Sequence, residues 1–512
     1  MQVIWSFSLV FPPPQTNGET VRDPQAFSKC PVHASLAWRS PARHCLPVRK
    51  LLVILVVGLT PELVGRHTPN LQRLATAGGL RPLKTVLPAV TCSVQSTLLT
   101  GAMPSVHGAV GNGWYFRDLA EIWLWRQSNR LIGGEKIWDA AKARDPEFTC
   151  AKMFWWYNMY ASVDWSATPR PMYPADGRKI PDHYSSPSEL HDELDARLGR
   201  FPLFKFWGPA ADIESSAWIA RATIHVMETR DPTLTLTYLP HLDYSLQRLG
   251  PDPDNPRLAA DLGEVDALCG ELFEAAGRQD RDVVIVSEYG ITPVSDAVHI
   301  NRALRRAGLI RVREEMGREQ LDAGASAAFA LADHQVAHIY VQAGAAIGEV
   351  KALVEKLDGV ETVLDTDGKR ARGLDHPRSG ELVAVSRPDR WFSYYYWLDE
   401  DRAPDYARTV DIHRKPGYDP VELFIDPAIR WPKLAVGSRL AKRALGMRTL
   451  LDVISPSDTP LVRGSHGRLT DTDHQGPLVI TSRPEFLPEG VMAATDFKAL
   501  ILNQIFGPKA SS

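Results

Sequence analysis

The pattern of apolar and polar positions along the chain predicts buried strands joined by helices. Three short runs are mainly apolar and rich in β-branched residues: Leu51–Val57, Leu234–Leu239 and Asp282–Ser287. Such runs are typical of strands buried on both faces of a parallel sheet. The amphipathic segment Leu258–Ala276 lies between the second and third runs and predicts a connecting helix. This order predicts right-handed crossovers in an α/β fold, with a mostly parallel central sheet and helices on both faces.

A block of small residues at helical spacing follows the extended segment at residues 86–90. Residues 91–100 predict a short helix, with Thr91 or Ser93 as its N-cap and Gly101 at its end. A helix N-terminus offers free N–H groups and the positive end of the helix dipole, and both favour a phosphoryl group. A hydroxyl at this place is either a candidate nucleophile or an ordinary helix cap.

Polar residues follow the other predicted strands. Asp243 and Gln247 come after the second strand, four positions apart, so they share a face if this turn is helical. Glu288 follows the third strand, and His466 lies in a Gly-Ser-His-Gly loop near the C-terminus. Ligands of parallel sheets collect at the carboxyl ends of the strands, so we expect these side chains near Thr91. Each also has an ordinary explanation as a helix cap, a solvated acid or a turn residue.

The composition of the chain argues against several classes of protein. The chain has 512 residues, is 44 % hydrophobic and 23 % charged, and carries a formal net charge of -3. It therefore has no charge excess that would predict a nucleic-acid or anionic-membrane partner. No apolar run reaches the roughly 18 residues that a membrane span needs. The five cysteines form no C-x-x-C pair, which argues against a disulfide framework or a thiolate zinc site and favours a cytoplasmic location.

The chain is expected to divide into an extension, a discontinuous core and two accessory parts. Residues 1–47 lack periodicity and predict a disordered leader, or a start codon assigned too early. The predicted catalytic core comprises residues 48–165, 230–310 and 371–512, with an inserted cap at 166–229 and a small α+β subdomain at 311–370.

Short motifs along residues 50–470 occur in an order known from one superfamily. They are the first strand running into Gly58-Leu59, Thr68-Pro-Asn-Leu71, the Thr91 block ending at Gly101, His107-Gly108 with Gly111-Asn-Gly-Trp-Tyr115, Asp243 with Gly250-Pro251, Ser287-x-x-Gly290, and Ser465-His466-Gly467. The chain in this respect resembles the alkaline phosphatase superfamily, and within it the nucleotide pyrophosphatase/phosphodiesterase branch. The resemblance implies an alkaline phosphatase-like fold and hydrolysis of phosphoesters.

The resemblance also implies two zinc ions, but the chain departs from the usual ligands. The departures are Val57 for the Asp that ends the first strand, Val94 for an Asn after the nucleophile, Gln247 for the His of a D-x-x-x-H pair, and Glu288 with Tyr289 for a D-H pair. The implied metal ligands that remain are Asp243, Gln247, Glu288 and His466. This set is richer in oxygen than a zinc site, which suits Mg²⁺ or Mn²⁺ better. One or two divalent ions, or a protein that has lost hydrolysis, all remain open.

If the chemistry is retained, the resemblance implies in-line attack by Thr91 and a phospho-threonine intermediate. Tyr289 would donate a hydrogen bond to a non-bridging oxygen of the substrate. The substrate would be nucleotide-like or another small phosphorylated molecule. The alternative is a catalytically impaired protein that binds a phosphorylated ligand or partner. The oligomeric state is not predicted.

Aromatic residues are concentrated just after the Thr91 block. Trp114 and Tyr115 belong to this group, which predicts either a substrate wall that stacks on a base or a sugar, or packing within the core. Arg126 lies among these aromatics and is a candidate contact for an oxyanion. With Asn112, these residues form the predicted substrate-binding set.

Overall fold

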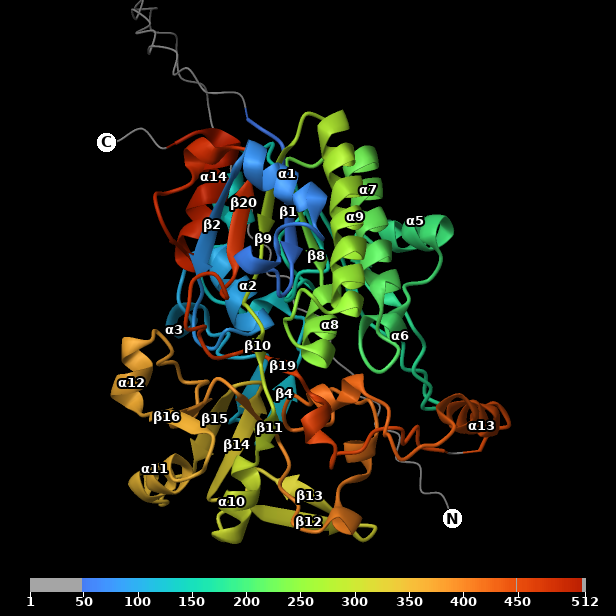
Figure 1. Cartoon of the computed structure of the whole chain (residues 1–512), viewed down its shortest axis with the longest axis vertical. Coiled ribbons are helices and arrows are strands. Elements are labelled where there is room, and N and C mark those ends of the chain that lie inside the picture. Colours follow the sequence, from blue (N-terminus) through green and yellow to red (C-terminus); the bar gives the residue numbers. More distant parts are fainter. Residues whose placement is uncertain (1–47, 448, 509–512) are drawn as a thin grey trace, which may run out of the picture. The chain divides into compact units, whose positions relative to one another are not determined.

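The computed structural model describes residues 48–447 and 449–508, so the predicted leader at 1–47 lies outside the described residues. A nine-stranded central sheet has the order β21-β2-β20-β9-β1-β8-β5-β6-β7 (Figure 1). Its strands are β1 (Leu51–Val56), β2 (Gly79–Lys84), β5 (Cys150–Met153), β6 (Trp165–Pro169), β7 (His183–Ser186), β8 (Leu234–Leu239), β9 (Asp282–Val286), β20 (Leu478–Thr481) and β21 (Met492–Ala493).

The three strands predicted from apolar runs lie side by side at the centre of this sheet. β1 runs parallel to both β8 and β9, and Leu51 pairs with Leu234 on one side and Asp282 on the other. All six residues of β1 are buried, as expected for a strand covered on both faces. The sheet is mostly parallel, but β20 is antiparallel to β9 and β7 is antiparallel to β6. The predicted α/β fold class is confirmed.

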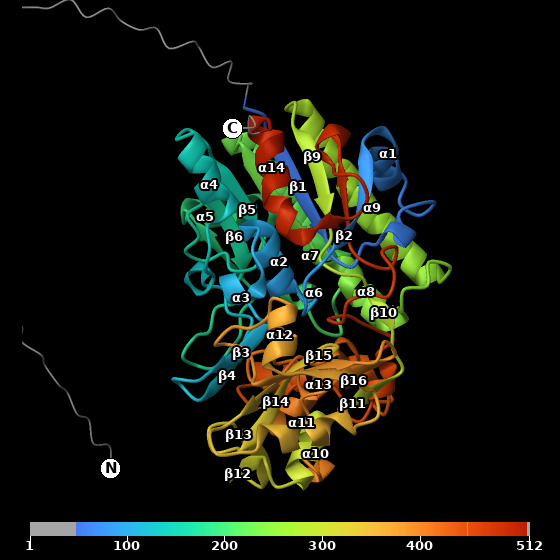
Figure 2. The same ribbon diagram turned by 90° about the vertical axis from the view of Figure 1, so that its left-hand side faces the viewer.

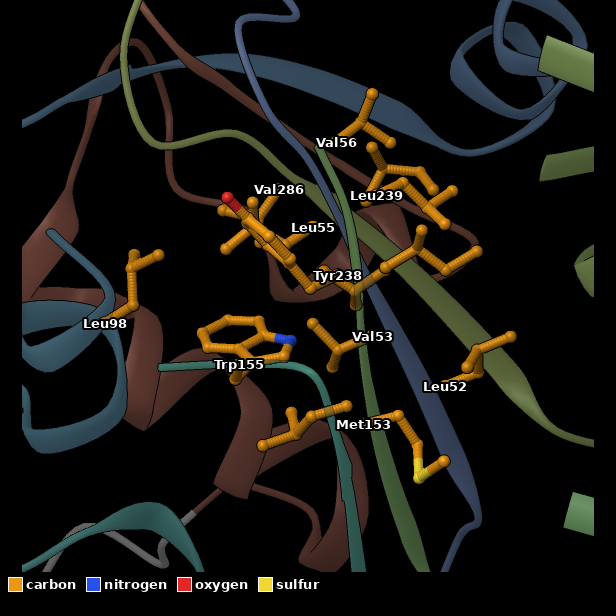
Figure 3. Close-up of a cluster of buried hydrophobic side chains, with 14 of the residues drawn as sticks. Leu52, Val53, Leu55, Val56, Leu98, Met153, Trp155, Tyr238, Leu239 and Val286 are labelled. Atoms are coloured by element: carbon orange, nitrogen blue, oxygen red, sulfur yellow. The ribbon is translucent and has the colours of Figure 1, made fainter. Parts of the chain in front are cut away.

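Helices cover the central sheet on both faces. α7 (Ile213–Arg230) and α9 (Pro256–Arg278) pack against each other on one face (Figure 1), and α9 contains the helix predicted between the strands. α2 (Thr91–Thr100), α4 (Ile137–Arg144) and α14 (Phe497–Phe506) form a second group on the other face (Figure 2). Figure 3 shows the packing between them, where side chains of β1 and β8 meet Trp155 and Leu98. Burying each such side chain contributes roughly 1.5 to 3 kcal/mol.

A separate antiparallel sheet has its own core. Its order is β14-β15-β17-β16, with β14 (Ala328–Asp333), β15 (Val336–Val341), β16 (Val360–Leu364) and β17 (Leu382–Ser386). Helices α10 (Ile300–Arg306), α11 (Ile347–Glu355) and α12 (Thr366–Ala371) contact it. β17 lies outside the predicted subdomain at 311–370, and β6 and β7 belong to the central sheet although most of their residues fall in the predicted cap at 166–229. The domain boundaries stay a prediction.

Short elements connect the two sheets and complete the chain. The helices are α1 (Pro69–Ala77), α3 (Pro104–His107), α5 (Glu189–Leu198), α6 (Leu203–Phe206), α8 (His241–Leu249) and α13 (Pro432–Ala444). The paired strands are β3 (Gly113–Phe116) with β4 (Glu121–Leu124), β10 (Thr292–Pro293) with β19 (Gly464–Ser465), β11 (Asp296–Val298) with β18 (Arg390–Phe392), and β12 (Arg311–Glu315) with β13 (Arg318–Asp322). In the part of the chain that the structure describes, no helix combines the length and apolar character needed to cross a bilayer.

The start of α2 differs from the prediction. Val90 takes the N-cap position with extended backbone, and Thr91 is the first residue of the helix. The Val90 side chain has no acceptor atom, and the Cys92 N–H at this end donates instead to Asn112 Oδ1. The helix ends at Gly101 as predicted, where φ is +68°.

Candidate active site

Four segments that are far apart in the sequence meet at the start of α2. They are α2 itself, α8 after β8, the loop after β9, and the loop after β19. We define the Thr91 site as the six side chains that these segments contribute: Thr91, Asp243, Gln247, Glu288, Tyr289 and His466. All six are at most 8 % exposed. The sequence prediction that these residues lie close together agrees with the distances below.

Tyr289 occupies the middle of the Thr91 site. Its hydroxyl oxygen lies 3.2 Å from Thr91 Oγ1, and it donates a hydrogen bond of 3.2 Å to Asp243 Oδ1. Its ring stacks on the imidazole of His466, with the ring centroids 3.6 Å apart. The phenol therefore fills the space between the predicted nucleophile and the first predicted metal ligand.

The second oxygen of Asp243 is bound by its neighbour on α8. Gln247 Nε2 donates to Asp243 Oδ2 over 2.8 Å, one helical turn away as the spacing predicts. Gln247 Oε1 in turn accepts a hydrogen bond of 2.8 Å from the Tyr418 hydroxyl. Both ends of the Gln247 amide are thus used, and neither is free to bind a further group without breaking a bond.

Glu288 is held from α2. Gln95, one turn after Thr91, donates to Glu288 Oε1 over 2.6 Å and accepts from the Trp156 N–H over 2.7 Å. Glu288 Oε2 is buried and has no hydrogen-bond partner among the described residues. Oε2 is therefore the oxygen of this carboxylate that can accept a proton or a hydrogen bond from a substrate.

Burial controls the charges of the two acids. It raises the pKa of Glu288 to about 8, against the opposing hydrogen bond from Gln95 and reinforced by the charge of Asp243. It also raises the pKa of Asp243 to about 7, against the hydrogen bonds from Tyr289 and Gln247. Near neutral pH, both carboxyls therefore exchange protons readily, as groups in acid-base catalysis must.

The imidazole ring of His466 is neutral, and a hydrogen bond to the backbone fixes its orientation. Its Nδ1 donates to the Ala89 carbonyl over 2.8 Å, which leaves Nε2 as an unprotonated nitrogen 3.7 Å from Asp243 Oδ1. Burial, with the neighbouring His334, holds the pKa of His466 well below its usual range. His474, the next histidine along the chain, is exposed.

Several residues around the site carry no local sequence pattern that predicts their place. His334 lies in the turn between β14 and β15, stacks on the Tyr418 ring with centroids 3.6 Å apart, and has its ring 3.7 Å from that of His466. Asp333 beside it accepts hydrogen bonds from the Asn112 N–H and Nδ2. These residues come from the small sheet, and nothing in their own sequence context indicates that they reach α2.

The predicted substrate-binding residues divide into two groups. Asn112 is buried and accepts a hydrogen bond from the Cys92 N–H over 3.0 Å, so it holds the first turn of α2. Trp114 and Tyr115 are buried in β3 and pack into hydrophobic clusters, which corresponds to the packing alternative. Arg126 alone of the four lines a surface cleft.

That cleft has a volume of about 320 Å³ and combines aromatic and basic side chains. Arg126 lies over the Trp123 ring at 3.0 Å from its centroid, and Arg170 and Tyr160 also line the cleft. Trp125, next to Arg126, packs on Trp156 with ring centroids 4.9 Å apart. Since the backbone N–H of Trp156 donates to Gln95, and Gln95 donates to Glu288, a chain of contacts leads from Trp125 to Glu288.

The side chains of the Thr91 site do not complete the two-zinc centre that the resemblance implies. Zinc takes three or four N, S or carboxylate ligands at about 2.0 to 2.3 Å. Val57 offers no ligand, both ends of the Gln247 amide are bonded, and the Tyr289 hydroxyl stands between Thr91 and Asp243. Within residues 48–447 and 449–508, the sets of three or more His, Cys, Asp or Glu side chains with ligand atoms within 4.8 Å of one another lie outside this site. The ion count and metal predicted from the sequence remain predictions.

Comparisons with known proteins agree with this architecture. The family described as Type I phosphodiesterase / nucleotide pyrophosphatase matches residues 51–419. An uncharacterized pyrophosphatase/phosphodiesterase of Schizosaccharomyces pombe is 25% identical over 258 residues, a match that covers 48% of this chain and 45% of that relative. The match thus spans about half of each protein.

Two solved structures share the fold. Murine ectonucleotide pyrophosphatase / phosphodiesterase 5, an inactive variant in complex with AMP, is 15% identical with a TM-score of 0.54, covering 91% of this chain and 96% of that one. Phosphonoacetate hydrolase from Sinorhizobium meliloti 1021, in complex with phosphonoformate, is 16% identical with a TM-score of 0.55, covering 90% and 96%. Because the family match spans most of the described chain and both folds agree, the chain belongs to the type I phosphodiesterase / nucleotide pyrophosphatase family of phosphoric ester hydrolases.

Proposed function

We propose that this protein is a phosphoester hydrolase in which Thr91 is the nucleophile. The observation that carries the proposal is the place of the Thr91 hydroxyl, at the first residue of α2 and 3.2 Å from the Tyr289 hydroxyl. A helix N-terminus stabilises the negative charge of a phosphoryl group. Membership of the family supports the same reaction class.

The side chains of the site supply the proton transfers. The reacting form has Glu288 ionised and Asp243 protonated, which is the less populated singly protonated form because Glu288 has the higher pKa. In this form Glu288 accepts the Thr91 proton while Thr91 Oγ1 bonds to phosphorus and the bond to the leaving oxygen breaks. Asp243, with its raised pKa, gives that oxygen a proton. Water then attacks the phospho-threonine and loses a proton to Asp243, and Glu288 returns the proton to Thr91. Tyr289 exchanges its bond to Asp243 for one to a non-bridging oxygen, where it stabilises developing charge.

The cleft beside Arg126 would receive the rest of the substrate. Its arginines and aromatic rings suit a planar or ring-containing group that carries negative charge. A nucleotide fits this description, and the AMP complex of the murine protein is consistent with it. A small nucleotide-like phosphodiester is therefore the proposed substrate class.

A second candidate function has its own support. Thr91 is only 4 % exposed, and the Tyr289 hydroxyl stands where an attacked phosphorus must come. A protein that keeps this arrangement would bind a phosphorylated ligand without cleaving it. The two candidates differ in whether Tyr289 yields its place to the substrate.

Trapping of the covalent intermediate decides between them. The full chain is incubated with bis(4-nitrophenyl) phosphate, quenched in acid, and the peptide that carries Thr91 is examined by mass spectrometry, with chelator and with added Zn²⁺, Mn²⁺ or Mg²⁺. We expect a phosphorylated Thr91 and nitrophenol release, with release lowered at least ~1000-fold in Thr91→Ala. Thr100→Ala is the matched control, because it removes a hydroxyl that bonds only locally at the far end of the same helix.

Each result has a defined meaning. Turnover that persists in Thr91→Ala contradicts the nucleophile. Absence of turnover together with AMP binding by calorimetry supports the binding protein. Turnover only with an added metal would contradict the metal-free proton transfers and restore the metal prediction.

A further inference from the structure

A second group of histidine and aspartate side chains lies between the edge of the central sheet and α5. His183 begins β7, the outermost strand, and Asp182 precedes it. His191 and Asp195 lie four positions apart on α5, which flanks α7 on the outer side of the molecule (Figure 1). We call these four residues the His183 cluster. None of them belongs to the Thr91 site.

The ligand atoms of the His183 cluster surround one small volume. One N or O atom from each of the four residues lies within 4.8 Å of the other three. Asp182 Oδ1 is 2.9 Å from His191 Nε2 and 3.9 Å from His183 Nδ1, and His183 Nδ1 is 3.7 Å from Asp195 Oδ1. Zinc bonds of about 2.0 to 2.2 Å in a tetrahedron place ligand atoms roughly 3.3 to 3.6 Å apart. The observed spacings bracket that value.

Buried atoms of the cluster have no hydrogen-bond partner in the described part of the chain. They are both ring nitrogens of His183 and Oδ1 of Asp195, and His183 is only 2 % exposed. A buried polar atom without a partner costs about 1 to 3 kcal/mol, so native proteins seldom keep several together without a purpose. A bound cation would satisfy His183 Nδ1 and Asp195 Oδ1 at once.

The outer contacts orient the ligands in the way that metal sites require. Asp192 Oδ1 lies 3.1 Å from His191 Nδ1 and accepts the proton of that nitrogen. His191 Nε2 faces the cluster, where it is hydrogen-bonded to Asp182 Oδ1 over 2.9 Å, and a metal ion would replace the proton of this bond. A carboxylate, a histidine and a metal in this order are a common feature of zinc sites. The edge of Trp218 packs on the His183 ring at 5.0 Å and limits its movement.

We propose that Asp182, His183, His191 and Asp195 form a binding site for one Zn²⁺ ion. Two imidazoles and two carboxylates match the ligand preference of zinc, whereas Mg²⁺ and Ca²⁺ prefer six or more oxygen ligands. The Asp195 and His191 side chains are 28% and 29% exposed, which gives the ion a path from solvent. With four protein ligands the site is closed and structural, and it fastens the edge strand β7 to α5.

Metal binding to the full chain tests the proposal. After treatment with chelator and gel filtration, the protein is titrated with Co²⁺ for the visible spectrum of a tetrahedral site, and with Zn²⁺ in a calorimeter. We expect one ion per chain and a Tm that zinc raises. Asp195→Asn and His191→Gln, both partly exposed and so tolerated by the fold, should each weaken zinc binding by at least ~100-fold.

Matched controls locate the ion. His466→Gln tests the Thr91 site, and Asp261→Asn tests a weaker set made by His241, Asp261 and the exposed Glu264. Both controls should keep the zinc and the cobalt spectrum. Failure of the wild-type chain to bind Zn²⁺, an octahedral cobalt spectrum, or loss of the ion in either control but not in Asp195→Asn would overturn the proposal. None of these readouts depends on hydrolytic activity.

Discussion

The Thr91 site and the His183 cluster are both built from buried titratable side chains, yet their hydrogen bonding differs. At the Thr91 site Glu288 Oε2 and His466 Nε2 lack a partner among the described residues, whereas His183 lacks one at both ring nitrogens. At the Thr91 site, Asp243 has both oxygens bonded and the Gln247 amide is bonded at both ends. In the His183 cluster, buried ring nitrogens and a carboxylate oxygen lack partners among the described residues. The family resemblance implies metal at the first place, and the geometry favours it at the second.

The difference shows that the place where a family resemblance implies a metal need not be the place where the geometry favours one. Tyr289 fills with a phenol the space between Thr91 and Asp243, so that space is stabilised by a neutral hydrogen-bonded network. The His183 cluster gathers two carboxylates with little to offset their charge except His191. Removing a side chain at the Thr91 site should therefore leave its hydrogen-bond partners unsatisfied. Removing one from the His183 cluster should instead remove polar atoms that already lack partners among the described residues.

The largest expected effect is a pH dependence of stability that comes from the Thr91 site. Burial raises the pKa of Glu288 from 4.5 to about 8 and that of Asp243 from 3.8 to about 7. Between these limits the folded protein holds more protons than the unfolded chain, so the free energy of unfolding is greatest below pH about 4 from this source and falls until about pH 8. The total change should be of the order of a few kcal/mol.

Urea denaturation of the wild-type chain and Glu288→Gln between pH 5 and pH 9 measures this effect. The variant should show a smaller decline, because its amide does not titrate. Equal declines in the two proteins would mean that Glu288 ionises as it does in the unfolded chain.

Replacing Gln247 by Leu should cost about 2 to 3 kcal/mol in the free energy of unfolding. The change leaves Asp243 Oδ2 without its donor and the Tyr418 hydroxyl without its acceptor, both in buried surroundings. Gln72→Leu on the exposed face of α1 is the control and should stay within about 0.5 kcal/mol. A similar loss in both variants would show that the network is not tightly held.

Tyr289→Phe should cost about 1 kcal/mol, less than Gln247→Leu, because the ring and its stack on His466 remain. Only the hydroxyl between Thr91 and Asp243 is lost. Chemical denaturation measures the cost, and the nitrophenyl assay should show slower turnover if Tyr289 contacts the phosphoryl group. Faster turnover would instead identify the hydroxyl as an obstruction to the substrate.

The smallest expected effect is at the other site. In metal-free protein, His183→Phe should change the unfolding free energy by at most about 1 kcal/mol in either direction, because the ring nitrogens that it removes have no partners in the described chain. In zinc-saturated protein the same substitution should lower the Tm relative to wild type. A large loss in metal-free protein would reveal bonds that the metal-free cluster makes.

The sequence predicted the centre of the fold well because its signal is local. The apolar runs of β1, β8 and β9 were identified within one residue of their bounds, and the residues after them met near Thr91 as the sheet topology requires. The N-cap was assigned to Thr91 or Ser93, whereas Val90 holds that position. Asn112, from later in the chain, accepts the bond that a local hydroxyl cap would accept.

Long-range partners could not be predicted from local patterns. Tyr418 and His334 approach Gln247 and His466 only through long-range packing, in which the Tyr418 N–H donates to the Ala332 carbonyl in β14. Trp114 and Tyr115 show an ambiguity of local patterns, since an aromatic-rich stretch is expected both in a substrate-binding wall and in a hydrophobic core, and these two residues are buried. The cytoplasmic location inferred from the cysteines stays a prediction.

The order of strands in the central sheet has a consequence for synthesis on the ribosome. β2 lies between β20 and β21, which are synthesised much later. The side chain of Arg81 in β2, for example, donates a hydrogen bond to the carbonyl of Pro488, which is 407 residues later in the chain. At about 5 to 20 residues per second, this delay lasts roughly 20 to 80 s. β2 during that time, and one edge of β9 from its own synthesis until that of β20, are unpaired strands that other nascent chains can join. The topology itself therefore leaves these edges open until β20 has been synthesised.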